Sequence, residues 1–354
     1  MADKQETSPQ MKAGASQARR NSLLARRALH ALGNFRGIAA LAAVLLLGVI
    51  FSPRSGATGK LMFLTSRLHS DTLFENAEYG ILAVGMTLVI LTGGIDLSVG
   101  SVLGFAATLS SLLMIAYGWA PVPAIAVTVM AGALAGSING FLISRFRVQP
   151  FVATLAMMVA ARGAAKWISG GIKVQPGARE TYVLQGDSPH FYTWMTSKVG
   201  GIGLEPATLL FIISIIVMLL VVRYTGFGRR LYAVGGNEEA ARLSGIRVAS
   251  VKIAAYVLCG ITAALAGVSN AARLQLGDPE AGFTYELDAI AAVVIGGTSL
   301  VGGQGGMFFT LVGTLIIGYV NKILSINAVA EHFRLLAKGG IIVLAVLIQQ
   351  RKKT

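Results

Sequence analysis

The sequence has little charge and a single cysteine. Only 13% of its 354 residues are charged, whereas 54% are hydrophobic, and the mean hydropathy is +0.68. The lone Cys259 excludes an intrachain disulfide and a cysteine-based metal site. The histidines His30, His69, His190 and His332 have no metal-ligand spacing. We therefore expect no metal and no cofactor, and the apolar excess predicts an integral membrane protein.

A nucleotide-binding loop is also missing. The nearest approach to the phosphate-loop pattern is "SGATGKL", which has Arg54 in place of the first glycine and Leu61 in place of the Mg²⁺-binding hydroxyl. No cluster of His, Asp, Glu or Ser typical of a membrane enzyme is present either. The chain is therefore predicted not to be an enzyme, and any ATP hydrolysis would occur on a separate chain.

Ten apolar runs approach the length that crosses a bilayer. They predict an all-α, polytopic membrane helix bundle with spans at 34–52, 76–92, 97–116, 121–143, 150–168, 207–222, 252–270, 287–301, 307–322 and 335–349. The glycine-rich "IGGTSLVGGQGGMF" separates the eighth and ninth runs. An interrupted or re-entrant segment at this point is the alternative to two full spans.

The net charge of +14 comes from Lys and Arg that gather on one side of this topology, in segments 1–36, 145–147, 223–252 and 351–353. The positive-inside rule then predicts that both termini are cytosolic, and it leaves no need for a nucleic-acid partner. We expect a basic disordered tail over 1–33 and a transmembrane domain over 34–350. A long external loop covers 169–206, and a long cytosolic loop covers 223–252.

The cytosolic loop contains a short predicted helix. Asn237 can cap it, Glu238 and Glu239 occupy its first turn, and Gly245 supplies a left-handed end. A helix of two turns has little stability alone, so it must rest either on its own bundle or on a cytosolic partner. Ala240 and Ala241 are small enough for close docking. The candidate coupling residues are Gly236, Asn237, Glu238, Glu239, Ala240, Ala241, Arg242, Leu243 and Gly245.

A glycine break holds an aspartate between apolar runs, in "LTGGIDLSVGS". Asp96 can accept the backbone N–H of Ser98 or Val99 and so satisfy donors that lipid cannot. It can also line a translocation pathway or its cytosolic gate. A second break, "GGTSLVGG", places Ser299 near the corresponding position. This similarity suggests two related halves whose breaks face one cavity.

Four stretches together resemble one family: "LAVGMTLVILTGGIDLSVGS" (82–101), "GSINGFLISRFRVQPFVATL" (136–155), "GRRLYAVGGNEEAARLSGI" (228–246) and "YELDAIAAVVIGGTSLVGG" (285–303). They are similar to the permeases of ribose-type sugar ABC importers. Glu239-Ala240-Ala241 with Gly245 also resembles the coupling-loop core of binding-protein-dependent permeases. Ala156 and "VGGQGG" depart from the usual family pattern.

The resemblance implies a homodimeric permease in a bacterial inner membrane, surrounded by lipid. Its partners would be a cytosolic ATP-binding cassette ATPase, a periplasmic sugar-binding protein and a second permease copy. The substrate would be a pentose, a hexose or an inositol-like polyol. The competing hypothesis is an ion-coupled secondary transporter, which would need acidic groups inside the membrane. From the sequence, Asp96 is the one residue assigned as such an acid.

Polar residues inside predicted spans are candidates for the substrate pathway, although an interhelical hydrogen bond or a helix cap is the alternative for each. Besides Asp96 they are Asn76, Tyr79, Thr87, Asn139, Thr154, Asn270 and Thr298. The small residues of "AGALAGSING" (131–140) are predicted to allow close helix packing. Arg162, Lys166 and Lys338 are predicted to extend toward lipid headgroups.

Overall fold

The computed structural model describes residues 37–56, 59–178, 188–200 and 203–350, and these residues are helical without a β-strand. The basic tail predicted over 1–33 lies outside them. In chain order the helices are Gly37–Ile50, η1 (Met62–Leu64), α2 (Ser66–Leu91), α3 (Val99–Ser111), η2 (Leu112–Ala116), α4 (Pro121–Arg145), α5 (Pro150–Ser169), α6 (Ser188–Thr196), α7 (Pro206–Tyr224), α8 (Gly226–Gly236), α9 (Glu238–Leu243), α10 (Val248–Leu274), α11 (Tyr285–Gly296), α12 (Met307–Ile326) and α13 (Glu331–Gln350).

Local sequence explains where several helices begin. Proline is the first residue of α4, α5 and α7, where its missing N–H is not needed and its fixed φ suits the helix. Thr65 caps α2 by accepting the N–H of Leu68. α5 ends at Gly170, which has a φ of +68°.

Seven helices in the described part of the chain are long and apolar enough to cross a membrane: α2, α3 with η2, α4, α5, α7, α10 and α12. Within the described residues, the run predicted at 34–52 forms the helix Gly37–Ile50. The run predicted at 287–301 does not form a full span, because α11 has 12 residues and ends at Gly296. The glycines therefore interrupt the chain here, which is the alternative that the sequence left open.

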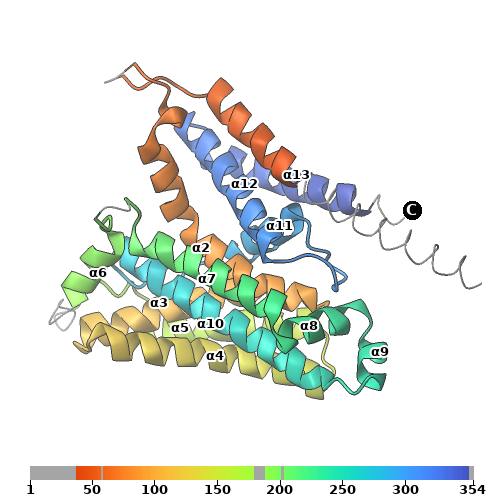
Figure 1. Cartoon of the computed structure of the whole chain (residues 1–354). Coiled ribbons are helices and arrows are strands. Elements are labelled where there is room, and N and C mark those ends of the chain that lie inside the picture. Colours follow the sequence, from red (N-terminus) through yellow and green to blue (C-terminus); the bar gives the residue numbers. More distant parts are fainter. Residues whose placement is uncertain (1–36, 57–58, 179–187, 201–202, 351–354) are drawn as a thin grey trace, which may run out of the picture.

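Figure 1 shows two groups of helices. The main bundle comprises α3, α4, α5, α7 and α10, which run roughly parallel, with α6 at one end and α8 and α9 at the other. The arm comprises Gly37–Ile50, α12 and α13, which lie above the bundle in this view. α2 belongs to both groups, because it packs against α7 and α10 and also against α11 and α12.

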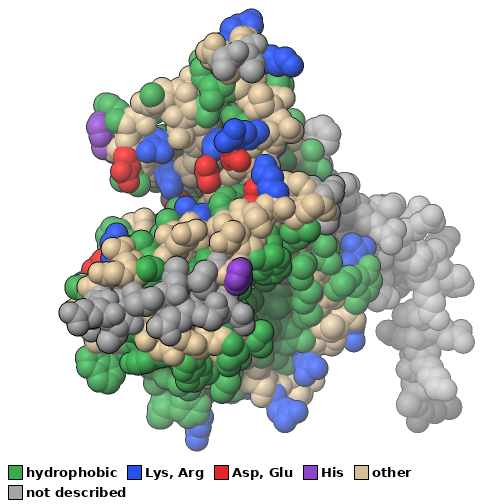
Figure 2. All heavy atoms as spheres, turned by 90° about the vertical axis from the view of Figure 1, so that its left-hand side faces the viewer, with side chains coloured by type: hydrophobic (Ala, Val, Ile, Leu, Met, Phe, Trp, Pro, Cys, Tyr) green, Lys and Arg blue, Asp and Glu red, His purple; other side chains and the backbone are tan. Residues whose placement is uncertain are grey.

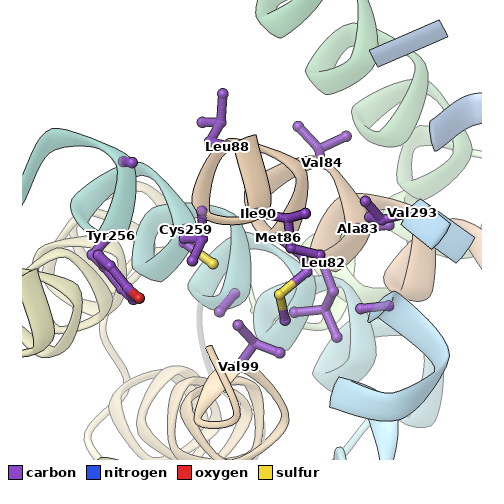
Figure 3. Packing of buried hydrophobic residues seen from close by; sticks show 14 of the residues in the cluster. Leu82, Ala83, Val84, Met86, Leu88, Ile90, Val99, Tyr256, Cys259 and Val293 are labelled. Atoms are coloured by element: carbon purple, nitrogen blue, oxygen red, sulfur yellow. The ribbon is translucent and has the colours of Figure 1, made fainter. Parts of the chain in front are cut away.

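The second half of α2 is the centre of the hydrophobic core. Its apolar residues from Ile81 to Leu91 are fully buried on every side of the helix, as expected for a helix that other helices surround. Figure 3 shows α2 side chains pointing in several directions, toward Val99 of α3, Tyr256 and Cys259 of α10, and Val293 of α11. This central helix leads directly into the Asp96 segment, so core packing positions that segment.

Helices α4 and α10 approach each other through glycines. A Cβ at Gly136 would collide with the carbonyl oxygen of Tyr256, and a Cβ at Gly260 would collide with that of Gly132. The close packing predicted for 131–140 is therefore confirmed. Small residues at such crossings let two membrane helices gain van der Waals contact along their backbones.

We predict that Gly136→Ala lowers the stability of the folded chain by about 1–3 kcal/mol, because the added methyl group overpacks this crossing. Gly163→Ala is the matched control, since nothing lies within 4 Å of a Cβ at that helical position. Removing a helical glycine there should be neutral or stabilise by about 0.5–1 kcal/mol. Thermal unfolding of the purified protein in detergent measures both, and equal midpoints for the two variants would contradict the packing argument.

Candidate translocation and coupling site

Asp96 satisfies the start of α3 from within the loop that follows α2. One of its carboxylate oxygens accepts the backbone N–H of Ser98 at 2.9 Å and the Ser98 hydroxyl at 2.6 Å. Asn139 of α4 donates to the same hydroxyl at 3.0 Å. Tyr256 of α10 donates to the carbonyl of Ile95 at 3.3 Å. The hydrogen bond from the Ser98 N–H to Asp96 is one of the two that the sequence predicted, and the hydrogen bond from Asn139 joins the loop to α4.

The two glycine breaks contact each other. The N–H of Gly303 donates to the carbonyl of Leu91, the last residue of α2, at 3.0 Å. Gly93 has a φ of +79°, and a Cβ there would lie 3.1 Å from the carbonyl oxygen of Val301. Ser299 accepts the N–H of Val301 two residues later, as Asp96 does with Ser98. The breaks therefore form one junction with similar local geometry.

The C-terminal end of α8 is part of the same junction. A Cβ at Gly235 would collide with the carbonyl oxygen of Leu91 and lie 2.6 Å from the nitrogen of Gly303. The Tyr232 hydroxyl donates to the carbonyl of Gly305 at 2.8 Å. We call this meeting of the two breaks (residues 91–98 and 297–306) with α8 the glycine junction. The end of α8 therefore contacts both breaks.

Helix α9 follows α8 directly and has the predicted cap. The Asn237 side chain accepts the N–H of Ala240 at 2.9 Å, and Gly245 has a φ of +79°. Glu238 forms an ion pair of 2.6 Å with Lys252 of α10. Glu239 pairs with Arg242 at 2.6 Å and raises the pKa of that guanidinium. The helix is therefore held partly by its own chain.

The two alanines of α9 do not share one face, which corrects the expectation that both allow docking. Ala241 is only 4% exposed and belongs to the main core cluster. Ala240 is exposed, and Leu243 is 80% exposed. The face available to a partner is thus formed by Ala240 and Leu243, while Ala241 anchors α9 to its own bundle.

A buried ionic cluster joins α2 to α10, and sequence reasoning missed it. Glu78 has no exposed surface and pairs with Arg273 at 2.6 Å. Asn270 donates to the same carboxylate at 2.7 Å. Asp96 is therefore not the sole acid within the apolar segments. Glu78 could have been found, because it lies inside the run predicted at 76–92.

A second charged pair lies beside this cluster. Asp288 of α11 pairs with Lys338 of α13 at 3.1 Å, and the rings of Tyr79 and Tyr285 lie 4.3 Å apart. Asp288, Lys338 and Asn321 line a small, mostly apolar pocket. Lys338 thus bonds to an acid of its own chain, and the prediction that it extends toward headgroups is wrong.

The remaining predicted pathway residues do not gather in one cavity. Asn76 donates to the carbonyl of Thr72, and Thr154 donates to that of Pro150. Thr87 bonds to Thr310 of α12 at 2.6 Å. The Thr298 hydroxyl accepts the N–H of Gly306 at 3.3 Å. Each of these residues serves a helix or a loop, which is the alternative considered for them from the sequence.

Basic residues of α5 hold the segment that follows α10. Arg162 donates to the carbonyls of Pro279 and Ala281 at 2.5 and 2.7 Å. Lys166 forms an ion pair of 2.5 Å with Glu280. Both side chains therefore bind the protein itself. Figure 2 shows charged side chains of both signs between the arm and the main bundle on this side of the molecule.

Most of the chain matches known transport proteins. Residues 69–346 match the family described as "Branched-chain amino acid transport system / permease component". The chain is 42% identical over 296 residues to the ribose import permease protein RbsC of Escherichia coli strain K12, covering 82% of this chain and 88% of that protein. It is 37% identical over 291 residues to the L-arabinose ABC transporter permease protein AraH of Azospirillum brasilense, covering 82% of each.

It is also 35% identical over 342 aligned positions to the xylose transport system permease protein XylH of Escherichia coli strain K12, covering 82% of this chain and 86% of that protein. The matches include the glycine junction, the capped helix α9 and the segment that leads into α11. The chain belongs to the branched-chain amino acid transport system / permease component family, as a multi-pass membrane permease of an ABC importer.

Proposed function

We propose that the chain is the membrane subunit of an ATP-driven importer that passes a pentose or a related polyol from a periplasmic binding protein to the cytosol. The observation that carries this proposal is the similarity, over four fifths of the chain, to relatives named for ribose, arabinose and xylose. The chemistry inside the membrane is compatible with an uncharged solute, because Glu78 and Asp288 are each paired with a cation.

The proposal includes a topology and an assembly. Both termini face the cytosol, and Gly37–Ile50, α11 and α13 complete a ten-segment arrangement in which α11 is a half-length helix. Lys and Arg of the α8–α9 region support this orientation. Two copies of the chain form a homodimer around the pathway, and the α2 and α11 breaks are the related elements of two halves.

Uptake by the complete transporter in vesicles tests the function. Labelled ribose, arabinose or xylose should enter only with the binding protein and ATP, and an uncoupler should leave uptake unchanged. An ion-coupled secondary transporter, the alternative considered from the sequence, would show the opposite pattern. The pairing of Glu78 with Arg273 favours ATP-driven transport, since that carboxylate already has a fixed counter-ion.

Coupling between ATP hydrolysis and transport follows from the position of α9. An ATPase bound to α9 moves α8 with it, and the end of α8 contacts both glycine breaks. Asp96 and Ser299 hold the local shape of those breaks. We therefore place the cytosolic gate at the glycine junction, with α8 and α9 as its lever.

We predict that Leu243→Glu weakens ATPase binding by about 1–3 kcal/mol, the usual cost of losing an apolar contact in a small interface. Folding should be unaffected, because Leu243 is 80% exposed. Co-purification of the two subunits and sugar-stimulated ATP hydrolysis measure the effect. The ATPase reaches α9 only from the cytosol, so the same measurement tests the orientation.

Two further variants make that experiment specific. Ala249→Glu adds the same charge at an exposed position in the first turn of α10 and should leave the complex intact. Ala241→Glu should destabilise the permease itself, because Ala241 is buried. A full yield of complex with normal stimulated ATPase in Leu243→Glu would exclude α9 as the coupling element.

We predict that Asp96→Asn keeps substantial transport, because the amide oxygen can still accept the N–H of Ser98. Asp96→Leu should lower the stability by about 1–3 kcal/mol, since it leaves buried donors of the loop without a partner. Yield, unfolding midpoint and uptake distinguish the two variants. If both fold as well as the parent chain and both abolish uptake, Asp96 acts in the pathway and its structural role is secondary.

A further inference from the structure

The segment between α10 and α11 turns back along α3. Where it starts, Val174 and Gly277 exchange two backbone hydrogen bonds of 2.8 and 2.9 Å. A Cβ at Gly277 would lie 2.8 Å from that of Ser111, and a Cβ at Gly104 would lie 2.5 Å from the carbonyl oxygen of Ala281. Gly282 and Gly100 are in equally close contact.

This path takes the segment into the depth of the membrane. Gly277 lies beside Thr108 of α3 and Gly282 lies beside Gly100, and this stretch of α3 rises by about 12 Å at 1.5 Å per residue. Because α3 with η2 is itself a candidate span, the non-helical residues 277–284 pass inward beside it. α11 begins only at the end of this path, at Tyr285. We call residues 277–284 the re-entrant segment.

The re-entrant segment is firmly held on one side. Arg162 bonds to two of its carbonyl groups. Lys166 pairs with Glu280 at 2.5 Å, and Lys173 pairs with Asp278 at 3.0 Å. Three basic side chains from α5 and the residues after it therefore fix its position against the main bundle.

Phe283 follows these contacts and is 73% exposed, and Leu287, one turn later, is 50% exposed. Irregular backbone is tolerated at membrane depth only where it is buried in protein or lines a water-filled cavity, because hydrocarbon offers no hydrogen-bond partners. Thr284, between Phe283 and Leu287, has a φ of +66°, which is unfavourable for a β-branched residue. Strained backbone conformations of this kind cluster at ligand-binding and other functional sites.

We infer that Phe283 lines the water-filled translocation pathway and contacts the sugar as it passes. The apolar C–H face of a pyranose or furanose can lie against an aromatic ring. A phenyl ring offers no hydrogen bond, so this contact is weak enough to release the solute, as a transport pathway requires. This assignment depends on the proposed sugar transport.

Thiol modification of the complete transporter in vesicles tests the aqueous position. Phe283→Cys should react with a charged, membrane-impermeant thiol reagent, and the native Cys259 is buried and silent. Val159→Cys is the matched control, since Val159 is 65% exposed in the middle of α5, a regular membrane helix that lipid can surround. Equal lack of reaction at both positions would overturn the inference. A disulfide between two copies of Phe283→Cys would identify a subunit contact and also overturn it.

Uptake measurements test the sugar contact. Phe283→Ala should raise the half-saturating sugar concentration or lower the uptake rate by about 2- to 10-fold, the range expected for one aromatic contact. Phe283→Tyr should stay close to the parent chain, because it keeps the ring. Full activity of Phe283→Leu, which keeps the apolar bulk without the ring, would show that Phe283 serves packing only.

The two arms separate this inference from the proposed function. If the parent transporter takes up no sugar, the proposed function fails and the sugar contact fails with it. Modification of Phe283→Cys would in that case still identify the re-entrant segment as part of a water-filled pathway for another solute. Normal sugar uptake with an unreactive Phe283→Cys would leave the function standing and reject the pathway assignment.

Discussion

Backbone groups inside a bilayer must find hydrogen-bond partners within the protein, and this constraint governs every place where the chain leaves the helical conformation. Three non-helical segments meet that demand in different ways. Asp96 binds the N–H of Ser98 after α2. The Gly303 N–H binds the end of α2 from the second break. Arg162 binds two carbonyl groups of the re-entrant segment. Specific hydrogen bonds therefore hold each of these three non-helical segments in a defined conformation.

Glycine allows the backbone turns in the two breaks, and it also allows the breaks to pack closely against the end of α8. Gly93 and Gly303 have positive φ values, and the close approach of Gly235 to Leu91 leaves no room for a side chain. As a result, the ends of α2 and α8 and the loop after α11 share one small junction. In the proposed coupling, α9 acts on this junction through α8, because rigid helices transmit a displacement to whatever their ends contact.

Charge inside the membrane is handled by pairing. Glu78 with Arg273 and Asp288 with Lys338 each form a neutral unit, and together they join α2 to α10 and α11 to α13. Removing one partner of such a pair would leave an uncompensated buried charge, which is strongly destabilising. The first pair therefore ties α2 to the main bundle, and the second ties α11 to the arm.

The sequence by itself determined the all-helical membrane class, the family, the glycine breaks and the capped helix at Asn237, because each depends on residues close together in the chain or on runs of similar composition. Only the tertiary structure decided that Glu78 pairs with Arg273, that Lys338 pairs with Asp288, and that Ala241 is buried while Leu243 is exposed. Those outcomes depend on how helices rotate and pack. Neighbours on a helix point about 100° apart, and the partners come from distant parts of the chain.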